Sequence, residues 1–230
     1  MFALLLPALA TTRQVIAVEL QAHGHTADID RPLSHEQMAD DIAALIKYLG
    51  LANADIFGYS MGGEVAWQTA IRHPDVVRRL VVVSAPCKNA GWHPDVVTGR
   101  EAMSAEAMTG TIMHEAYVNT APNPTYWPKM VAKMKQFNAT AGDYDWSKDV
   151  AAIKALTLIV IGDADFVRLD HAAEMFGLLG GGKVDWGMGG VPKPRLAVLP
   201  GTTHFTIFAR TDLLLPILTP FLDAPMPAAN

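Results

Sequence analysis

The sequence is poor in cysteine and charged residues, and it has no long hydrophobic run. Its 230 residues include one cysteine, Cys87, so no disulfide can form within the chain and a reducing compartment is compatible with the fold. We interpret Cys87 as a small buried side chain beside a strand end. No stretch approaches the ~18–20 apolar residues that a membrane-spanning helix needs. We therefore expect no membrane partner and take the cytoplasm as the default location.

Basic residues are also scarce. Eighteen Lys and Arg stand against 23 Asp and Glu, which gives a net charge of −5, and no basic run is present that suits a phosphate backbone. Nucleic acid is therefore a poor candidate partner. Half of the residues are hydrophobic, which excludes a disordered or fibrous chain and suffices for a sizeable core. The length favours one domain, with room for an insertion.

Continuous apolar runs of strand length alternate with helical patterns along the chain. Runs rich in β-branched residues are typical of parallel strands that are buried on both faces. We expect such strands at 14–20, 54–57, 80–83, 156–161 and 196–199. Helices are expected at 34–49, 61–72, 171–179 and 211–222, the first of them opened by a capping box of Ser34 and Gln37. This alternation predicts an α/β fold, with a mostly parallel sheet covered by helices on both faces.

The alternation lapses over residues 87–150. This segment contains five of the 11 methionines and three of the five tryptophans, which predicts a helical insertion suited to lining an apolar pocket. For any single one of these side chains, a place in the insertion's own small core is the better interpretation. We therefore divide the chain into a core, residues 1–86 and 151–230, and a helical insertion at 87–150.

The pattern G-x-S-x-G occurs at Gly58-Tyr59-Ser60-Met61-Gly62, between an expected strand and an expected helix. A sharp strand-to-helix turn strains the serine backbone and projects the hydroxyl above the sheet, and the flanking glycines avoid collisions there. We therefore predict Ser60 as a nucleophile and the Met61 N–H as an oxyanion donor. A purely structural turn is the alternative interpretation.

A serine nucleophile needs a base, and the base needs a group that orients it. Asp163 and Asp165 follow the expected strand at 156–161, and His204 follows the one at 196–199. Because the carboxyl ends of parallel strands meet at one edge of a sheet, we expect an aspartate and His204 to lie beside Ser60.

In this order of serine, acid and histidine, the chain resembles the α/β-hydrolases over nearly its whole length. The resemblance implies Asp165 as the acid, three residues after Gly162, with Asp163 as its rival, and it implies that the insertion at 87–150 is a cap. It also implies a cofactor-free serine hydrolase acting on a small or medium apolar carboxylic ester or lactone. Activity should fall below the usual imidazole pKa of ~6.5. We expect Tyr59, Trp127 and Phe205 to contact the substrate.

The resemblance further implies a strand that the sequence lacks. In the family, a strand before the first helix ends in a His-Gly loop that supplies a second oxyanion N–H, whereas residues 1–10 resemble the helix after that loop. The strand would lie between the strands expected at 14–20 and 54–57. We therefore expect the N-terminal strands of the family to be absent. The two neighbouring strands would then have unpaired N–H and C=O groups, each costing about 1–3 kcal/mol if buried. We also expect impaired activity, since loss of one oxyanion donor costs about 10²–10³ in turnover.

The sequence also contains weaker signals of other functions. A catalytically silent relative that binds a small apolar ligand is the main alternative. His23 and His25 resemble the paired ligands of metal hydrolases, but no second ligand cluster is evident, so we expect no metal. The pattern G-x-x-x-x-G-K occurs at residues 177–183, yet Val184 replaces the required Ser or Thr, so we expect no nucleotide cofactor. The sequence does not indicate the acyl preference or the oligomeric state.

Overall fold

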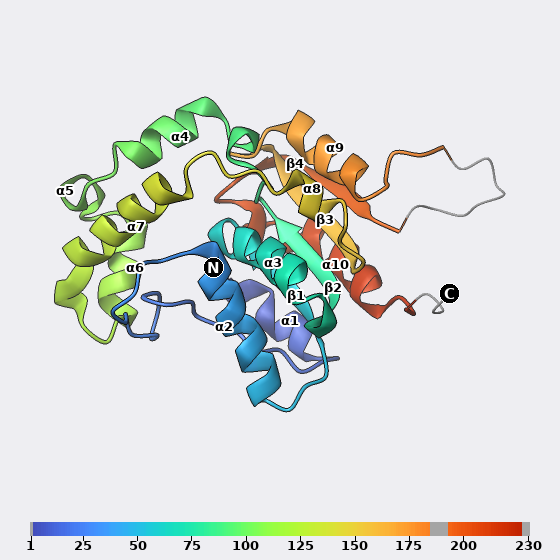
Figure 1. Cartoon of the computed structure of the whole chain (residues 1–230), viewed down its shortest axis with the longest axis horizontal. Coiled ribbons are helices and arrows are strands. Elements are labelled where there is room, and N and C mark those ends of the chain that lie inside the picture. Colours follow the sequence, from blue (N-terminus) through green and yellow to red (C-terminus); the bar gives the residue numbers. More distant parts are fainter. Residues whose placement is uncertain (1, 185–192, 227–230) are drawn as a thin grey trace.

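The computed structural model describes residues 2–184 and 193–226, and within them the chain forms one parallel sheet of four strands (Figure 1). The strands lie in the sheet in their sequence order, and each pairs in parallel with the next. They are β1 (Ala54–Tyr59), β2 (Val77–Val83), β3 (Leu156–Ala164) and β4 (Arg195–Thr203). The expected α/β class is confirmed, and four of the five expected strands are present.

Helices cover both faces of this sheet. Alternate residues of β2 divide between the faces: Leu80 and Val82 pack toward one, Val81 and Val83 toward the other. The first face is covered by α3 (Met61–Arg72) and α9 (Leu169–Leu178), with α2 (His35–Tyr48) packed on α3. The second is covered by α1 (Leu6–Ala10) and α10 (Thr211–Asp223) (Figure 1). Short 3-10 turns are η1 (Phe2–Leu4), η2 (Pro74–Val76), η3 (Asn89–Gly91), η4 (Pro124–Tyr126) and η5 (Ile207–Ala209).

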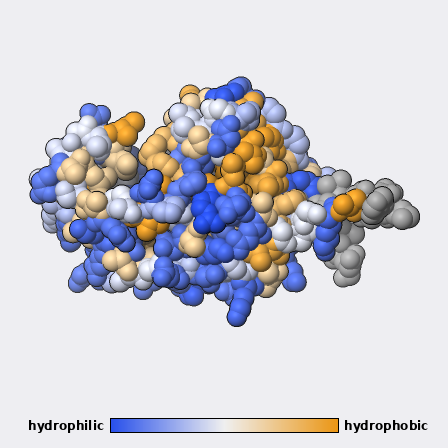
Figure 2. Space-filling model, turned by 90° about the horizontal axis from the view of Figure 1, so that it is seen from above, coloured by the Kyte–Doolittle hydropathy of each residue, from blue (hydrophilic) through white to orange (hydrophobic). Residues whose placement is uncertain are grey.

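Residues 87–150, called here the helical segment, connect β2 to β3. Their helices are α4 (Pro94–Glu101), α5 (Ala105–Met108), α6 (Ile112–Thr120), α7 (Trp127–Ala141) and α8 (Ser147–Val150). Seen from above, α5, α6 and α7 form a smaller lobe at the left, and hydrophobic residues gather on the main body beside it (Figure 2). The separate cap domain that the resemblance implies stays a prediction.

The first expected helix start is confirmed in atomic detail. The Ser34 hydroxyl oxygen accepts a hydrogen bond of 3.1 Å from the Gln37 N–H at the start of α2. Such a cap satisfies one of the first-turn N–H groups that have no partner inside the helix. Gly50, just past the end of the helix, has a φ of +70°, a value that favours glycine.

The prediction of a strand at residues 14–20 is wrong. These residues have no regular secondary structure, and Ile16 and Val18 are each 44% exposed. An apolar β-branched run becomes a strand only where a neighbour offers ladder partners, and among the described residues β1 pairs with β2 alone. β1 is therefore an edge strand of the described sheet, and residues 14–20 form no strand that could flank a missing one.

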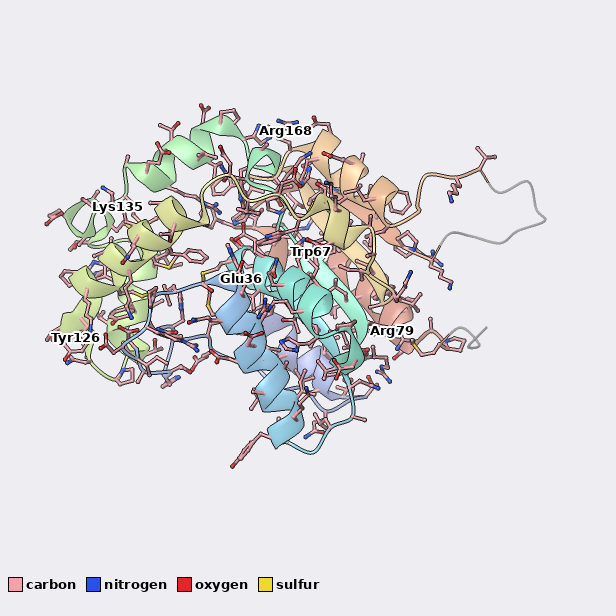
Figure 3. All side chains as sticks on the ribbon, viewed as in Figure 1. Glu36, Trp67, Arg79, Tyr126, Lys135 and Arg168 are labelled. Carbon is pink, nitrogen blue, oxygen red and sulfur yellow. The ribbon has the colours of Figure 1, made fainter. Side chains whose placement is uncertain are left out.

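Long side chains fix the core around this sheet. Trp67 of α3 is fully buried, and its indole N–H donates to the carbonyl of Ala85 at 3.3 Å (Figure 3). Arg79 of β2 is 2% exposed and donates to the carbonyl of Ala224, just after α10 (Figure 3). Among the described helices, none combines the length and the apolar character required to cross a membrane.

Candidate active site

Three of the predicted residues lie together at the carboxyl edge of the sheet. Ser60 directly follows β1, Asp165 follows β3 and His204 follows β4. The Ser60 Oγ lies 3.1 Å from His204 Nε2, and His204 Nδ1 lies 2.9 Å from Asp165 Oδ1. A continuous chain of hydrogen bonds therefore joins a serine, a histidine and a carboxylate, as a serine nucleophile requires.

The turn at Ser60 has the strained geometry expected of a nucleophile on a strand-to-helix turn. Ser60 has a φ of +52°, which is rare for a residue other than glycine. A Cβ on Gly58 would lie 2.1 Å from the carbonyl oxygen of Gly62, so this position requires glycine. Met61 opens α3, and its N–H has no acceptor within the helix and lies at the positive end of the helix dipole. This N–H is therefore suited to bind a developing oxyanion.

The carboxylate of Asp165 is buried and fully hydrogen-bonded. The side chain is 0% exposed, and backbone N–H groups of Gly162 and Val167 donate to Oδ2 and Oδ1 at 3.0 and 3.2 Å. Burial alone raises the pKa of Asp165, but the hydrogen bonds from His204 and Ser84 outweigh it and hold this pKa below its usual value. Asp165 is therefore ionised at neutral pH.

Asp163, the rival acid, has a different set of partners. Its carboxylate accepts the N–H groups of Gly201 and Thr202 at 2.9 and 3.0 Å, and these bonds lower the pKa of Asp163. The side chain is exposed. Asp163 thus holds the loop that leads to His204, whereas Asp165 contacts the imidazole itself.

Aromatic rings surround the imidazole of His204. Phe166 stacks on it with ring centroids 4.4 Å apart and planes 12° apart, and Trp92 meets it edge-on at 6.0 Å. Phe205, one of the expected substrate contacts, lies at 5.5 Å and is 58% exposed. Tyr59, another, packs at 5.0 Å. An apolar group bound beside Ser60 would therefore find aromatic surface around the histidine.

The hydroxyl of Tyr59 has a structural partner in this site. It donates to the backbone carbonyl of His204 at 2.7 Å. Burial, together with the negative charge of Asp165, raises the pKa of Tyr59, so the hydroxyl keeps its proton and its donor role. Whether Tyr59 and Phe205 also touch substrate stays a prediction.

Trp127 has its contacts inside the helical segment. Its indole N–H donates to the Ala105 carbonyl at 3.3 Å, and its ring packs against His114 and Tyr117. These contacts agree with the interpretation that individual aromatic residues form the small core of this segment. The expected substrate contact of Trp127 stays a prediction.

A cavity of about 440 Å³ lies between the helical segment and the helices of the core. Glu64 lines it, and the Glu64 carboxylate accepts the indole N–H of Trp92 at 3.2 Å, so Trp92 contacts both the cavity lining and His204. The lining combines charged, polar and aromatic side chains and contains no methionine, unlike the apolar pocket expected from the sequence. It includes His35, Glu64, Arg100, Lys135, Phe137 and Tyr144.

The histidine pair considered as a metal site has protein partners. His23 Nδ1 lies 2.8 Å from the carbonyl oxygen of Gln21, and His25 Nδ1 lies 3.1 Å from Glu19. Over residues 2–184 and 193–226, no group of three or more His, Cys, Asp or Glu side chains is arranged to hold a metal ion.

Comparison with known proteins identifies the fold. Residues 1–108 match the family model described as "alpha/beta hydrolase fold". A pimeloyl-[acyl-carrier protein] methyl ester esterase of Neisseria meningitidis is 46% identical over 85 residues, which are 37% of this chain and 31% of that protein. The enol-lactonase of Burkholderia xenovorans superposes with a TM-score of 0.71 at 20% identity, over 97% of this chain and 86% of that one. The chain therefore has the α/β-hydrolase fold.

The similarity to sequence relatives is partial. An sn-1-specific diacylglycerol lipase ABHD11 of Danio rerio is 25% identical over 176 residues, which are 74% of this chain and 55% of that protein. The first relatives, esterases and lipases by name, are matched over 24 to 31% of their own length. The chain thus spans less than a third of the length of these relatives.

One buried polar residue at this edge escaped the sequence analysis. Ser84 follows β2, and its hydroxyl lies 2.5 Å from Asp165 Oδ2. The signal was its place directly after an expected strand, the same place that singles out Ser60. No motif surrounds Ser84, and a serine after a strand is common in turns, so the pattern alone did not distinguish it.

Proposed function

We propose that the protein is a serine hydrolase that cleaves a small or medium apolar carboxylic ester or lactone through an acyl-enzyme. The observation that carries the proposal is the hydrogen-bond chain from Ser60 through His204 to Asp165. The aromatic rings around His204 support an apolar group next to the scissile bond. The names of the relatives, a methyl ester esterase and an enol-lactonase among them, agree with ester or lactone chemistry.

In this reaction Ser60 Oγ attacks the carbonyl carbon while His204 Nε2 takes the hydroxyl proton. Asp165 keeps the proton on Nδ1 and stabilises the imidazolium that forms. The Met61 N–H donates to the negative oxygen of the tetrahedral intermediate. The carbon–oxygen bond to the leaving group then breaks, His204 returns the proton to the alkoxide, and an acyl-enzyme remains. Water repeats the steps, again with His204 as base, and releases the acid.

A fluorophosphonate probe tests this proposal, because it labels only an activated serine. We expect labelling of the wild-type chain and loss of labelling in Ser60→Ala and in His204→Ala. Matched controls are Ser147→Ala and His114→Ala, which lie in the helical segment and should be labelled like wild type. Equal labelling of His204→Ala would contradict the proposed base, and no labelling of folded wild-type protein would contradict the hydrolase.

A ligand-binding protein without catalysis is the second candidate. The observation in its favour is the cavity of about 440 Å³, whose lining residues do not include Ser60. Such a protein would be unlabelled by the probe, yet small aromatic or apolar compounds would raise its melting temperature. Phe137→Ala removes an aromatic ring from the cavity lining and should abolish that rise. Probe labelling at Ser60 decides for the hydrolase.

A further inference from the structure

Each of the four strands ends one residue before a polar side chain at the same edge of the sheet. Ser60, Asp165 and His204 follow β1, β3 and β4, and the fourth position, after β2, is Ser84. The backbones of the two serines continue the ladder in the same way: Ser60 N–H donates to Val83 at 3.0 Å and Ser84 N–H to Val160 at 2.9 Å. Their φ angles are +52° and +53°. Ser84 thus repeats the backbone geometry of the nucleophile one strand further along.

The hydroxyl of Ser84 binds the carboxylate of Asp165. Ser84 is 0% exposed, and its Oγ donates to Asp165 Oδ2 at 2.5 Å. The Gly162 N–H donates to the same oxygen. The other oxygen, Oδ1, accepts from Val167 and His204. The two carboxylate oxygens therefore have different partners: Oδ2 is held by Ser84 and Gly162, and Oδ1 faces His204.

We propose that Ser84 is a positioning residue for the histidine, acting through Asp165. The final torsion of an aspartate side chain is broad and roughly two-fold, so a carboxylate needs bonds on its outer oxygen to keep the other one aimed at Nδ1. Ser84 and Gly162 supply those bonds. A left-handed φ at a residue other than glycine costs free energy and persists only where the surrounding structure enforces it. A serine at this position, in place of a glycine, is therefore consistent with a role for its hydroxyl. This role rests on the proposed hydrolase function.

Two substitutions separate the hydroxyl from the backbone. Ser84→Ala removes the hydroxyl and keeps the strained φ, whereas Ser84→Gly removes the hydroxyl and relieves the strain. If Ser84 positions Asp165, both variants lose kcat by about tenfold, the rate equivalent of one hydrogen bond, with KM unchanged. If Ser84 only forms the turn, Ser84→Gly retains the wild-type kcat. The matched control is Thr69→Val, which removes another fully buried hydroxyl, one that donates to Val65 in α3.

A second readout does not depend on turnover. The proton on His204 Nδ1 gives a far-downfield NMR resonance when an aligned carboxylate accepts it. We expect this resonance in the folded wild type and in Thr69→Val, and its upfield movement or loss in both Ser84 variants. An unchanged resonance together with an unchanged kcat in either folded variant would overturn the proposal. Failure of the hydrolase is distinguishable, because it leaves Ser60 of the wild type unlabelled while the resonance still reports on the Ser84 variants.

Discussion

Tyr59, the residue before Ser60, holds the backbone of His204. Its hydroxyl donates to the His204 carbonyl at 2.7 Å, although 145 positions separate the two residues in sequence. The end of β1 and the loop after β4 are therefore tied together across the sheet edge. This bond fixes where the imidazole can lie relative to Ser60, independently of the bond between His204 and Asp165.

Replacing Tyr59 by phenylalanine should loosen this connection. The change leaves a buried carbonyl without its donor, so we expect the free energy of unfolding to fall by about 1–3 kcal/mol and kcat to fall with it. Chemical denaturation measures the first effect and an ester assay the second. The exposed Tyr48 provides the control, since Tyr48→Phe should change the free energy of unfolding by less than about 0.5 kcal/mol. Equal stability of the two variants would show that the bond is unimportant.

The two aspartates of the β3 turn should respond differently to the same substitution. Asp165→Asn removes the charge that orients His204, and we expect kcat to fall by about 10³–10⁴. Asp163→Asn alters a carboxylate bound to two backbone N–H groups, so a loss below about tenfold is expected. Steady-state kinetics of the two variants measure both effects. The reverse order of losses would make Asp163 the acid.

The Asp40 carboxylate makes stability depend on pH. Hydrogen bonds from Arg72 and then His73 lower the pKa of Asp40 from 3.8 to about 2. Because the pKa is lower in the folded state, this contribution is complete above pH 3.8 and is lost as the pH falls toward 2. The side chain is 43% exposed, and solvent screening limits the contribution to about 0–1 kcal/mol.

Asp40→Asn should therefore lower the free energy of unfolding by up to about 1 kcal/mol at pH 7, and this difference should shrink as the pH falls from 3.8 toward 2. Denaturant titrations of wild type and variant across this range measure the difference. Asp30→Asn, at an exposed aspartate outside this pair, controls for the general loss of one negative charge. A difference between wild type and Asp40→Asn that is as large at pH 2 as at pH 7 would assign the effect to something other than ionisation.

Local pattern was sufficient to predict most of the fold and the three joined residues. β2 and β3 come from apolar runs, and α2 comes from a capped helical period. Position after a strand end singled out Ser60 and His204, whereas the choice of Asp165 over Asp163 came from the resemblance to the α/β-hydrolases. These signals are local in sequence, and the parallel sheet converts them into proximity because its strands end at one edge.

The same local patterns could not predict which segments pair as strands or which side chains form hydrogen bonds with each other. Residues 14–20 have the composition of a strand, but β structure depends on a neighbour, and composition contains no information about one. Ser84 has no motif, so its bond to Asp165 emerged only from the placement of β2 beside β3. The hydrogen bonds of Glu64 were missed for a related reason, since its partners come from α2 and from the helical segment.

Glu64 joins the core to the helical segment through a buried carboxylate. It is 3% exposed, lies 3.3 Å from His35 Nε2 and accepts hydrogen bonds from Trp92 and Tyr144. Burial alone raises the pKa of Glu64, but the bond and charge of His35 outweigh it and keep this pKa below its usual value. The carboxylate is therefore a buried charge whose partners come from both parts of the protein.

Removing this carboxylate should strongly destabilise the protein. Glu64→Ala strands its buried partners, so we expect a loss of about 3–5 kcal/mol in the free energy of unfolding, whereas the control Glu106→Ala, at an exposed site on α5, should lose less than about 0.5 kcal/mol. Combining Glu64→Leu with His35→Leu replaces both members of the pair by apolar groups, and the double variant should lose less than the sum of the single losses. Chemical denaturation of the wild type, of Glu64→Leu, of His35→Leu and of the double variant completes the cycle. Additive losses would mean that Glu64 and His35 are not coupled.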